Sequence, residues 1–515
     1  MSGVSTGADV LLHTLIANGI DTCFMNPGTS EMHFVSALDR VLAMRGILCL
    51  FEGVCSGAAD GYARVTGKPA ATLLHLGPGL ANGLANFHNA RKARVPIVNI
   101  VGEHSTAHLR YDAPLSANIE NFARTVSDRV RTARSGHELG ADISATIADA
   151  VQPPGQVATL IVPADLSWSP AEGCGAVVAP SLRRMPSSAA ISRAAELVRK
   201  PATALLLGGS ALAPNALDAA ARLSSATGVR VHIARNVPRI WSGRGLYRPT
   251  QVPYFPEPAL EMFAGTQNLI LVEAKTPVSF FGYPNTPGCL VPDSCQISML
   301  AGVEEDGAGA LEALAHGYPS VVQPEDPAPS PVTEGPLTLD AIGAIVAAYL
   351  PENTLISEEM ISSAAPVLDR LANAAPHERL PVTGGSIGQG LPVAVGAAVA
   401  CPDRKVIALE ADGSGMYTLQ ALWTMARENL DVLTVIFANR RYRILDIEMQ
   451  RTGAYGFGPE AGKLIDIGAP DLDWPSLAAG MGVPASRATS AAEFAAQLRT
   501  AVREKGPRLI EALIA

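Results

Sequence analysis

The chain has 515 residues, which is too long for one ordinary hydrophobic core and suggests about three domains. Hydrophobic residues make up 48% of it and charged residues 17%, a composition typical of well-buried globular proteins and not of disordered ones. The net charge of −9 argues against a nucleic acid or an anionic membrane as a partner.

The sequence carries no pattern of export or membrane insertion. Residues 1–8 lack the basic head and apolar run of a signal peptide, and no stretch reaches the ~18 apolar residues of a membrane span. The seven cysteines are an odd number without a Cys-x-x-Cys pair, which is typical of reduced packing residues. We therefore expect a cytoplasmic protein without a membrane partner.

Strand and helix patterns alternate through the first third of the chain. Residues 11–16 carry an apolar helical face, and residues 31–42 are again helical in pattern. Short apolar runs between such helices predict buried strands, so a parallel sheet covered by helices is expected. The expected strands cover residues 22–25, 47–50, 70–75, 96–102 and 159–165.

Three strand ends in this part of the chain carry candidate functional residues. The first strand ends in the turn Asn26-Pro27-Gly28-Thr29, and the second ends at Glu52, where a helix of small residues begins. The helix dipole alone would stabilise a carboxylate there by about 0.5 kcal/mol. His75 ends the third strand, where a lone histidine is usually only a satisfied polar residue. The glycines in the expected loop 76–83 let the backbone pass close to a ligand.

Two segments rich in proline and small residues, 167–188 and 323–336, are interpreted as linkers. They divide the chain into three expected domains, which span residues 1–170, 190–322 and 337–515. The middle part repeats the alternation of strand and helix. Its turn Gly208-Gly209-Ser210 lacks the full Gly-x-Gly-x-x-Gly fingerprint of a dinucleotide site. We predict the α/β class, with three doubly wound parallel-sheet domains.

Two polar residues follow neighbouring strands in the last third of the chain. Residues 405–409 and 432–437 are apolar runs typical of buried strands, and Asp412 and Asn439 come shortly after them. Because parallel strands of one sheet end at the same edge, we expect these side chains to lie close together. Their oxygens, beside the free N–H groups of a helix start, suit a divalent cation such as Mg2+ that carries a diphosphate. Asp-Gly-Ser is also common as a plain turn.

The segments around Asp412 and Asn439 resemble the thiamine-diphosphate motif of the acetohydroxyacid (acetolactate) synthase and benzoylformate decarboxylase superfamily. That motif is Gly-Asp-Gly, a helix and a strand, then Asn-Asn; here Ala411 and Ala438 replace its first Gly and its first Asn. The resemblance implies that thiamine diphosphate and Mg2+ bind here. It implies metal ligands from the side chains of Asp412 and Asn439 and the carbonyl of Arg441, with cofactor contacts from Gly413, Ser414 and Tyr442.

The resemblance extends to the strand ends of the first domain. In the family, a glutamate before a helix that ends Gly-Tyr-Ala-Arg hydrogen-bonds the aminopyrimidine ring of the cofactor and promotes its activation. Glu52 and residues 61–64 match that pattern. The segment after His75 resembles the family's Gly-Pro-Gly-x-x-Asn loop, and benzoylformate decarboxylases place a catalytic histidine here, so Glu52 and His75 are the catalytic candidates. The remaining candidates are Asn26 and Gly28, for cofactor binding, and Thr29, at the position of a serine in those decarboxylases.

A glycine-rich segment of the third domain packs on the cofactor in the family. By this resemblance Gly385 is the backbone acceptor for the 4′-amino group, and Ile387 is the large apolar side chain that bends the cofactor. The helix that starts at Tyr442 would border the pocket. Its Glu448 is interpreted as part of a solvated face, whereas an inward glutamate would disfavour a plain aromatic substrate.

The central domain departs from two relatives in the family. Acetohydroxyacid synthases bind FAD in this domain, but the segment from Glu273 to Phe281 does not resemble their flavin-binding segment, which makes bound FAD doubtful. Benzoylformate decarboxylases carry a second catalytic histidine in a similar segment, and residues 280–283 contain none.

The resemblance implies a thiamine-diphosphate- and Mg2+-dependent enzyme that decarboxylates a 2-oxo acid, with carboligation as in acetolactate synthase. A simple decarboxylase of the benzoylformate type is one alternative, which His75 favours. A non-catalytic subunit that binds thiamine diphosphate is another, which Ala411 and Ala438 favour. Because Glu52 and Asp412 lie in different domains and meet across a subunit interface in the family, we expect a homodimer or homotetramer.

Overall fold

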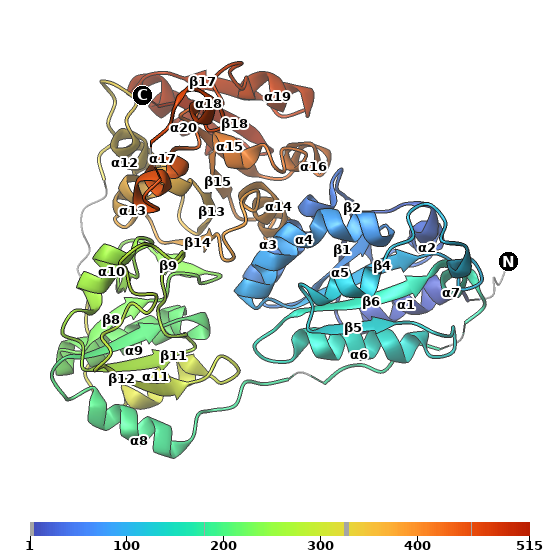
Figure 1. The fold of residues 1–515 in the computed structure, drawn as a ribbon, viewed down its shortest axis with the longest axis horizontal. Helices are drawn as coiled ribbons and strands as arrows, with labels where there is room; N and C mark the ends of the chain where they lie inside the picture. The colour runs from blue at the N-terminus through green and yellow to red at the C-terminus, as the bar shows by residue number, and fades with distance from the viewer. Residues whose placement is uncertain (1–4, 172, 180, 324–328, 455, 515) are drawn as a thin grey trace.

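The computed structural model describes residues 5–171, 173–179, 181–323, 329–454 and 456–514. The chain forms three lobes, each built on its own sheet flanked by helices (Figure 1). The prediction of an α/β fold with three doubly wound sheets is confirmed. The domain bounds stay a prediction, and residues 172, 180 and 324–328 of the two expected linkers lie outside the described residues.

The first domain contains a sheet of six parallel strands. These are β1 (Thr22–Asn26), β2 (Arg45–Leu48), β3 (Ala70–Leu74), β4 (Ile97–Glu103), β5 (Arg129–Thr132) and β6 (Val157–Pro163), in the order β2-β1-β3-β4-β6-β5. The helices are α1 (Gly7–Ala17), α2 (Met32–Ala37), α3 (Glu52–Thr66), α4 (Leu76–Ala93), α5 (Ile119–Arg124), α6 (Leu139–Val151) and α7 (Ala164–Trp168). Alternate residues of β4 enter different cores, Val98 with α1 and α6 and Ile97 with α3 and α4, because helices cover both faces.

Two expectations for this domain are wrong in detail. The helix expected over 31–42 is shorter, since α2 ends at Ala37. The loop expected over 76–83 is instead the beginning of α4, in which Gly79 N donates to His75 O at 2.9 Å. Leu76 and Leu80 are buried at helical spacing in that segment, so its periodicity outweighs its glycine content.

The central domain contains a sheet of five parallel strands. They are β7 (Thr203–Leu207), β8 (Arg230–Ile233), β10 (Thr250–Gln251), β11 (Asn268–Val272) and β12 (Gln296–Ala301), in the order β10-β8-β7-β11-β12. The helices are α8 (Ser188–Leu197), α9 (Pro214–Thr227), α10 (Pro256–Phe263) and α11 (Gly307–Leu314). Every strand pair of this sheet is parallel, as predicted.

The third domain contains a sheet of seven strands, of which one comes from the central part of the chain. The strands are β9 (Ile240–Ser242), β13 (Thr354–Glu359), β14 (His377–Pro381), β15 (Val406–Ala411), β16 (Val432–Ala438), β17 (Ala485–Ala488) and β18 (Arg508–Leu513), in the order β17-β18-β16-β15-β13-β14-β9. Strand β9 pairs antiparallel with β14 and so joins the central segment to this sheet.

Nine helices of the third domain lie within the described residues. They are α12 (Leu339–Tyr349), α13 (Ala364–Leu371), α14 (Gly390–Ala400), α15 (Asp412–Gly415), α16 (Ala421–Arg427), α17 (Arg443–Arg451), α18 (Pro459–Lys463), α19 (Trp474–Gly480) and α20 (Ala491–Ala501). Helix α16 begins only at Ala421, because the preceding residues form turns in which Thr418 Oγ1 donates to Gly388 O at 3.0 Å. No helix of the described residues is both long and apolar enough to span a bilayer.

Helix α3 of the first domain lies directly against α14 of the third (Figure 1). Glycines allow this close approach. A Cβ atom at Gly61 would lie 2.2 Å from Val393 O, and one at Gly396 would lie 1.9 Å from Ala58 O. Larger side chains at these positions would push the helices apart. The two domains therefore share one continuous apolar core.

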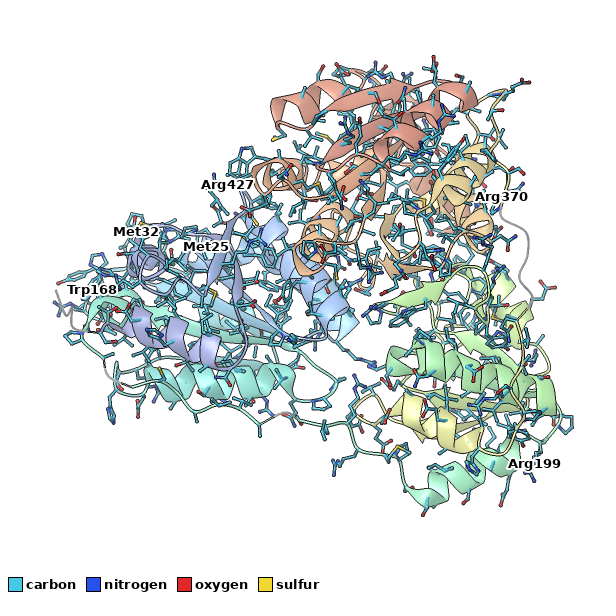
Figure 2. All side chains as sticks on the ribbon, turned by 180° about the vertical axis from the view of Figure 1, so that it is seen from behind. Met25, Met32, Trp168, Arg199, Arg370 and Arg427 are labelled. Carbon is cyan, nitrogen blue, oxygen red and sulfur yellow. The ribbon has the colours of Figure 1, made fainter. Side chains whose placement is uncertain are left out.

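The edges of the same interface carry charged contacts. Seen from behind, Arg427 at the end of α16 lies beside the first domain, while Arg370 and Arg199 lie on the outside of the other two lobes (Figure 2). The neighbouring Glu428 forms an ion pair of 2.8 Å with Arg45 of β2. This pair is partly exposed and contributes little to stability.

Arg64 near the end of α3 forms a fully buried ion pair within its helix and also connects the first domain to the third by hydrogen bonds. Its Nη2 lies 2.6 Å from Asp60 Oδ2, and neither side chain is exposed. Its Nη1 donates to Pro381 O at 2.7 Å, and Nη2 also donates to Thr383 Oγ1 at 3.0 Å. Burial raises the pKa of Asp60, and the Arg64 charge opposes this. The guanidinium therefore compensates a buried carboxylate and fixes a segment of the third domain.

We predict that Arg64→Met destabilises the protein. The change leaves the Asp60 carboxylate buried without a partner, which costs about 3–5 kcal/mol. Thermal unfolding followed by circular dichroism measures the loss. Arg91→Met is the control, since it breaks an exposed pair of 3.3 Å with Asp128 and should cost under about 1 kcal/mol. Equal unfolding midpoints for the two variants would contradict the structural role of Arg64.

Candidate active site

Asp412 and Asn439 lie at the same edge of the third sheet. Strands β15 and β16 are parallel neighbours, and Ala411 of one pairs with Phe437 of the other. Asp412 and Asn439 follow directly beyond these strands. Asp412 Oδ2 accepts a hydrogen bond from Arg440 N at 2.6 Å, so its carboxylate reaches the turn that contains Asn439. The structure thus places the two residues together, as the strand pattern predicts.

The surroundings of Asp412 orient its carboxylate without neutralising it. The side chain is buried, Oδ1 accepts from Gly413 N at 2.9 Å, and no Lys or Arg of the described residues pairs with it. Burial raises the pKa of Asp412, and backbone N–H groups of Arg440, Gly413 and Asn439 oppose this. A cation placed beside the carboxylate would favour its charged form further.

The other two expected metal ligands belong to the same turn. Asn439 Oδ1 accepts from Arg441 N at 2.9 Å, and Arg441 O accepts from Arg443 N at 2.8 Å. The Arg441 side chain turns away and binds Asp446 at 2.6 Å. Among the described residues, no group of three His, Cys, Asp or Glu side chains is arranged to hold a metal. One carboxylate, one amide and one carbonyl fit Mg2+ when a diphosphate supplies further oxygens.

The expected cofactor contacts Gly413, Ser414 and Tyr442 surround this edge. Gly413 lies against the Tyr442 ring, where a Cβ atom would come within 2.5 Å of a ring carbon. Ser414 is buried in the short helix α15. A glycine is therefore required next to Asp412 by the packing of Tyr442, whereas Ala411 at the other side is tolerated at the end of β15.

Glu52 occupies the corresponding strand edge of the first domain. Glu52 is the first residue of α3, and its side chain is almost completely buried. Oε1 accepts from Asn26 Nδ2 at 3.1 Å, and Oε2 accepts from Asn82 Nδ2 at 3.0 Å. A Cβ atom at Gly79 would lie 3.4 Å from Oε1, so the first turns of α4 also line the carboxylate. Two neutral amides hold Glu52 and leave it free to exchange a proton.

His75 and Glu31 form a second pair of titratable side chains nearby. His75 Nδ1 lies 2.8 Å from Glu31 Oε2, which also accepts from Gly28 N at 2.7 Å. Burial raises the pKa of Glu31, and Gly28 N and His75 oppose this. The Gly28 backbone is held close to the imidazole, since a Cβ atom there would lie 2.5 Å from the ring. The carboxylate favours the tautomer with the proton on Nδ1, which leaves Nε2 as the second exchange position.

A glycine-rich segment of the third domain meets the Glu52 helix in the same chain. Asn86 Nδ2 of α4 donates to Gly53 O at 2.8 Å and to Gly388 O at 3.1 Å. Gly385 has a φ of +80°, and the Phe280 ring of the central domain lies where its Cβ atom would be. Ile387 is half-buried between these glycines. The segment thus touches all three domains.

Two buried carboxyl groups lie beside the backbone of this segment. Glu359 at the end of β13 accepts from Gly388 N at 2.8 Å and from Gly390 N at 2.5 Å. Glu410 lies beside it, and neither of its oxygens meets a donor among the described protein groups. Burial raises the pKa of both carboxyls. We assign the proton to Glu410 and the charge to Glu359, which receives the backbone donors.

The interpretation of Glu448 as a solvated side chain is wrong. Its Oε1 accepts from the hydroxyls of Tyr283 at 3.1 Å and Tyr254 at 3.4 Å, both in the central domain. Arg451, one turn along α17, lies 4.1 Å from the centre of the Phe255 ring. Contacts with the central domain therefore hold the polar side of α17, which local periodicity does not reveal.

Several residues of the site escape prediction from local patterns. Glu31, Asn86, Glu359 and Glu410 act through contacts between segments that lie far apart in the sequence. Glu31 has one local signal, since it follows Gly28 by three residues in a turn whose free N–H needs an acceptor. Thr29 stands in the same turn and is exposed.

Two family models match the chain. Residues 5–147 match the model described as the N-terminal TPP binding domain of thiamine pyrophosphate enzymes, and residues 369–512 match the C-terminal TPP binding domain. The matched regions contain the edges that carry Glu52 and Asp412, respectively. Both halves of the candidate site therefore fall within domains of this family.

Individual relatives cover nearly the whole chain. A protein of Mycobacterium tuberculosis named "Putative acetolactate synthase large subunit IlvX" is 48% identical over 99% of both chains. A benzoylformate decarboxylase of Pseudomonas aeruginosa is 26% identical over 96% of both. The solved structure of a thiamine diphosphate-dependent 4-hydroxybenzoylformate decarboxylase of Rhodococcus jostii matches with a TM-score of 0.87 at 25% identity, over 99% of both chains.

We predict that Asp412→Asn weakens cofactor binding without unfolding the protein. The amide supplies one neutral oxygen in place of a charged one, so the metal that carries the diphosphate is held less tightly. The Kd of thiamine diphosphate in excess Mg2+ should rise about 10-fold or more, as measured by calorimetry. Asp369→Asn, on the exposed side of α13, should leave it unchanged. Equal affinity of Asp412→Asn and the unchanged protein would exclude Asp412 as a metal ligand.

Proposed function

The chain belongs to the thiamine pyrophosphate enzyme family, and we propose that it is a Mg2+-dependent enzyme that decarboxylates a 2-oxo acid. The observation that carries this proposal is the placement of Glu52, a buried carboxylate that, among the described residues, is held by the amides of Asn26 and Asn82 alone. A buried carboxylate without a cationic partner is suited to proton transfer. Asp412 and Asn439 supply the matching metal site in the other family domain.

Bound thiamine diphosphate would supply a nucleophilic carbon and an electron sink for the loss of CO2. The residues present fit this group on observations that do not depend on the family. The edge around Asp412 offers hard oxygen ligands beside a glycine turn, and the edge around Glu52 offers an acceptor for a ring N–H. Asp412, Asn439 and the Arg441 carbonyl would hold the metal, with Gly413, Ser414 and Tyr442 around the diphosphate.

Glu52 would act as the proton-transferring residue of the cofactor site. Asn26 and Asn82 fix the two oxygens of its carboxylate, so its orientation is set before any ligand binds. Gly385 and Ile387, on the segment that Asn86 connects to α3, would position the cofactor ring. Gly385 has the left-handed backbone conformation that only glycine adopts easily.

His75 would exchange a proton with the substrate or product. Its Nδ1 is held by Glu31, so Nε2 is the atom available for this exchange. A positioned proton donor favours release of an aldehyde, as in a simple decarboxylase. The alternative fate of the bound fragment is transfer to a second carbonyl compound, as in acetolactate synthases, and the similarity of the chain to the mycobacterial relative supports it.

We propose a homodimer or homotetramer in which Glu52 of one chain and Asp412 of another complete each site. The proposal rests on the family and on the separation of these residues into different domains. The net charge of −9 argues against a nucleic acid partner. We also propose a cytoplasmic location, because the cysteine pattern is typical of reduced thiols.

We predict CO2 release from at least one member of a 2-oxo acid panel that includes pyruvate and benzoylformate, with thiamine diphosphate and Mg2+ added. Glu52→Gln should lower turnover at least about 100-fold, because the amide cannot transfer the proton, and should leave cofactor affinity nearly unchanged. Identification of the products distinguishes an aldehyde from acetolactate.

The control for this experiment is Glu120→Gln, an exposed change on α5 that should keep full turnover. Full activity of Glu52→Gln would contradict the assigned role of Glu52. If the unchanged protein binds the cofactor but releases no CO2 from any acid of the panel, the result would instead support a non-catalytic subunit. Ala411 and Ala438 favour this alternative.

A further inference from the structure

A carboxylate of the chain itself lies at the carboxyl edge of the central sheet, where open α/β sheets ordinarily receive a ligand. Glu273 directly follows β11 and is almost completely buried. Its Oε2 accepts from Ser210 N at 3.1 Å and from Arg183 Nη1 at 2.6 Å. Its Oε1 accepts from Gly307 N at 2.9 Å and from the Ser210 hydroxyl. Two backbone N–H groups, a hydroxyl and a guanidinium thus enclose one oxyanion.

The backbone around Glu273 is shaped to admit its carboxylate. A Cβ atom at Gly209 would lie 2.0 Å from Oε2, and one at Gly307 would lie 2.6 Å from Oε1. Gly209 also has a φ of +51°, and Glu273 itself has a φ of +49°, which a non-glycine residue adopts only under constraint. The strained backbone directs the side chain into the turn and the start of α11.

These donors are the ones that proteins use to bind phosphate. Gly307 N belongs to the first turn of α11, a helix of eight residues, and Arg183 adds a full positive charge. The Glu273 carboxylate has the same charge sign and a similar oxygen spacing to one face of a phosphate group. It therefore fills the position that the anionic part of a ligand would take.

The space next to this position is large and basic. A cavity of about 1220 Å³ between the domains is lined by residues 208–210 and by Glu273. Arg94, Arg235 and Lys275 also line it. Among the described residues Arg235 has no ion pair and contacts the Tyr254 ring at 5.7 Å. An excess of positive side chains favours a phosphate-bearing ligand in this cavity once the enclosed position is vacant.

We propose that the central domain contains an oxyanion-binding site that Glu273 of the same chain occupies, so that flavins and nucleotides do not bind there. The internal carboxylate replaces a ligand in organising the sheet edge. The inference accounts for the absence of a flavin-binding pattern after Val272, and it does not depend on which 2-oxo acid the protein uses.

The enclosed carboxylate also connects two domains. Arg183 lies in the segment between the first and central domains, and it donates to Val303 O at 2.9 Å and to Pro154 O of the first domain at 3.3 Å. The Nη1 that donates to Val303 O also donates to Glu273, whereas Nη2 makes the bond to Pro154 O. The site therefore holds this segment in place without any bound ligand.

Removal of the Glu273 side chain tests the proposal. Glu273→Gly empties the site and suits the positive φ, so it should bind inorganic phosphate at least about tenfold more tightly than the unchanged protein, as measured by calorimetry on the full-length protein. Glu304→Gly removes an exposed carboxylate near Arg94 and should gain no affinity. Equal phosphate affinity of Glu273→Gly and the unchanged protein would overturn the proposal. Stoichiometric binding of FAD by the unchanged protein would overturn it as well.

Glu273→Gln provides a second test if the glycine variant does not fold. The glutamine amide keeps the volume of the glutamate side chain but loses the charge-assisted hydrogen bond to Arg183. Its NH2 group would also face N–H donors that now bind the carboxylate. Its thermal unfolding midpoint should fall below that of Ser210→Ala, which loses only one hydroxyl donor. A midpoint equal to that of the unchanged protein would show that the carboxylate is not held as a bound anion.

Discussion

The close contact between α3 and α14 is the constraint on which the candidate site depends. Glycines at positions 61 and 396 let these helices approach until backbone atoms touch across the domain interface. Helix α3 begins with Glu52, and α14 begins directly after the glycine-rich segment that contains Gly385 and Ile387. The same packing therefore fixes the Glu52 carboxylate and the segment expected to hold the cofactor ring, which in the proposed oligomer belong to two different sites. Arg64 strengthens the interface by compensating Asp60 where no water reaches it.

Four carboxylates of this protein differ in their partners. Asp60 and Glu273, which have structural roles, are paired with the guanidinium groups of Arg64 and Arg183, respectively. Glu52 and Asp412 receive only amide or backbone N–H donors among the described residues. Neutral donors orient a carboxylate and leave its charge available for a proton or a metal ion. This difference supports the proposed roles independently of sequence similarity.

Local patterns predict the sheet edges well, because buried apolar runs and the turns after them are properties of short segments. The placement of Asp412 beside Asn439 follows from two such runs and the geometry of parallel strands. The helical start of α4 was missed because its glycines resemble those of a loop. Glu448 and Glu31 depend on partners that the fold alone brings near, the former on two tyrosines of another domain. Short-range periodicity contains no information about such partners.

Glu52 is proposed to activate the cofactor, and this role can be tested without knowing the substrate. The direct measurement is the exchange of the C2 proton of thiamine diphosphate for deuterium, followed by NMR after rapid acid quench, in the presence of the protein and Mg2+. We predict exchange at least about 100-fold faster than in free thiamine diphosphate at the same pH, because a positioned carboxylate assists proton transfer. Exchange at the rate of the free cofactor, with the cofactor shown to be bound, would contradict the account.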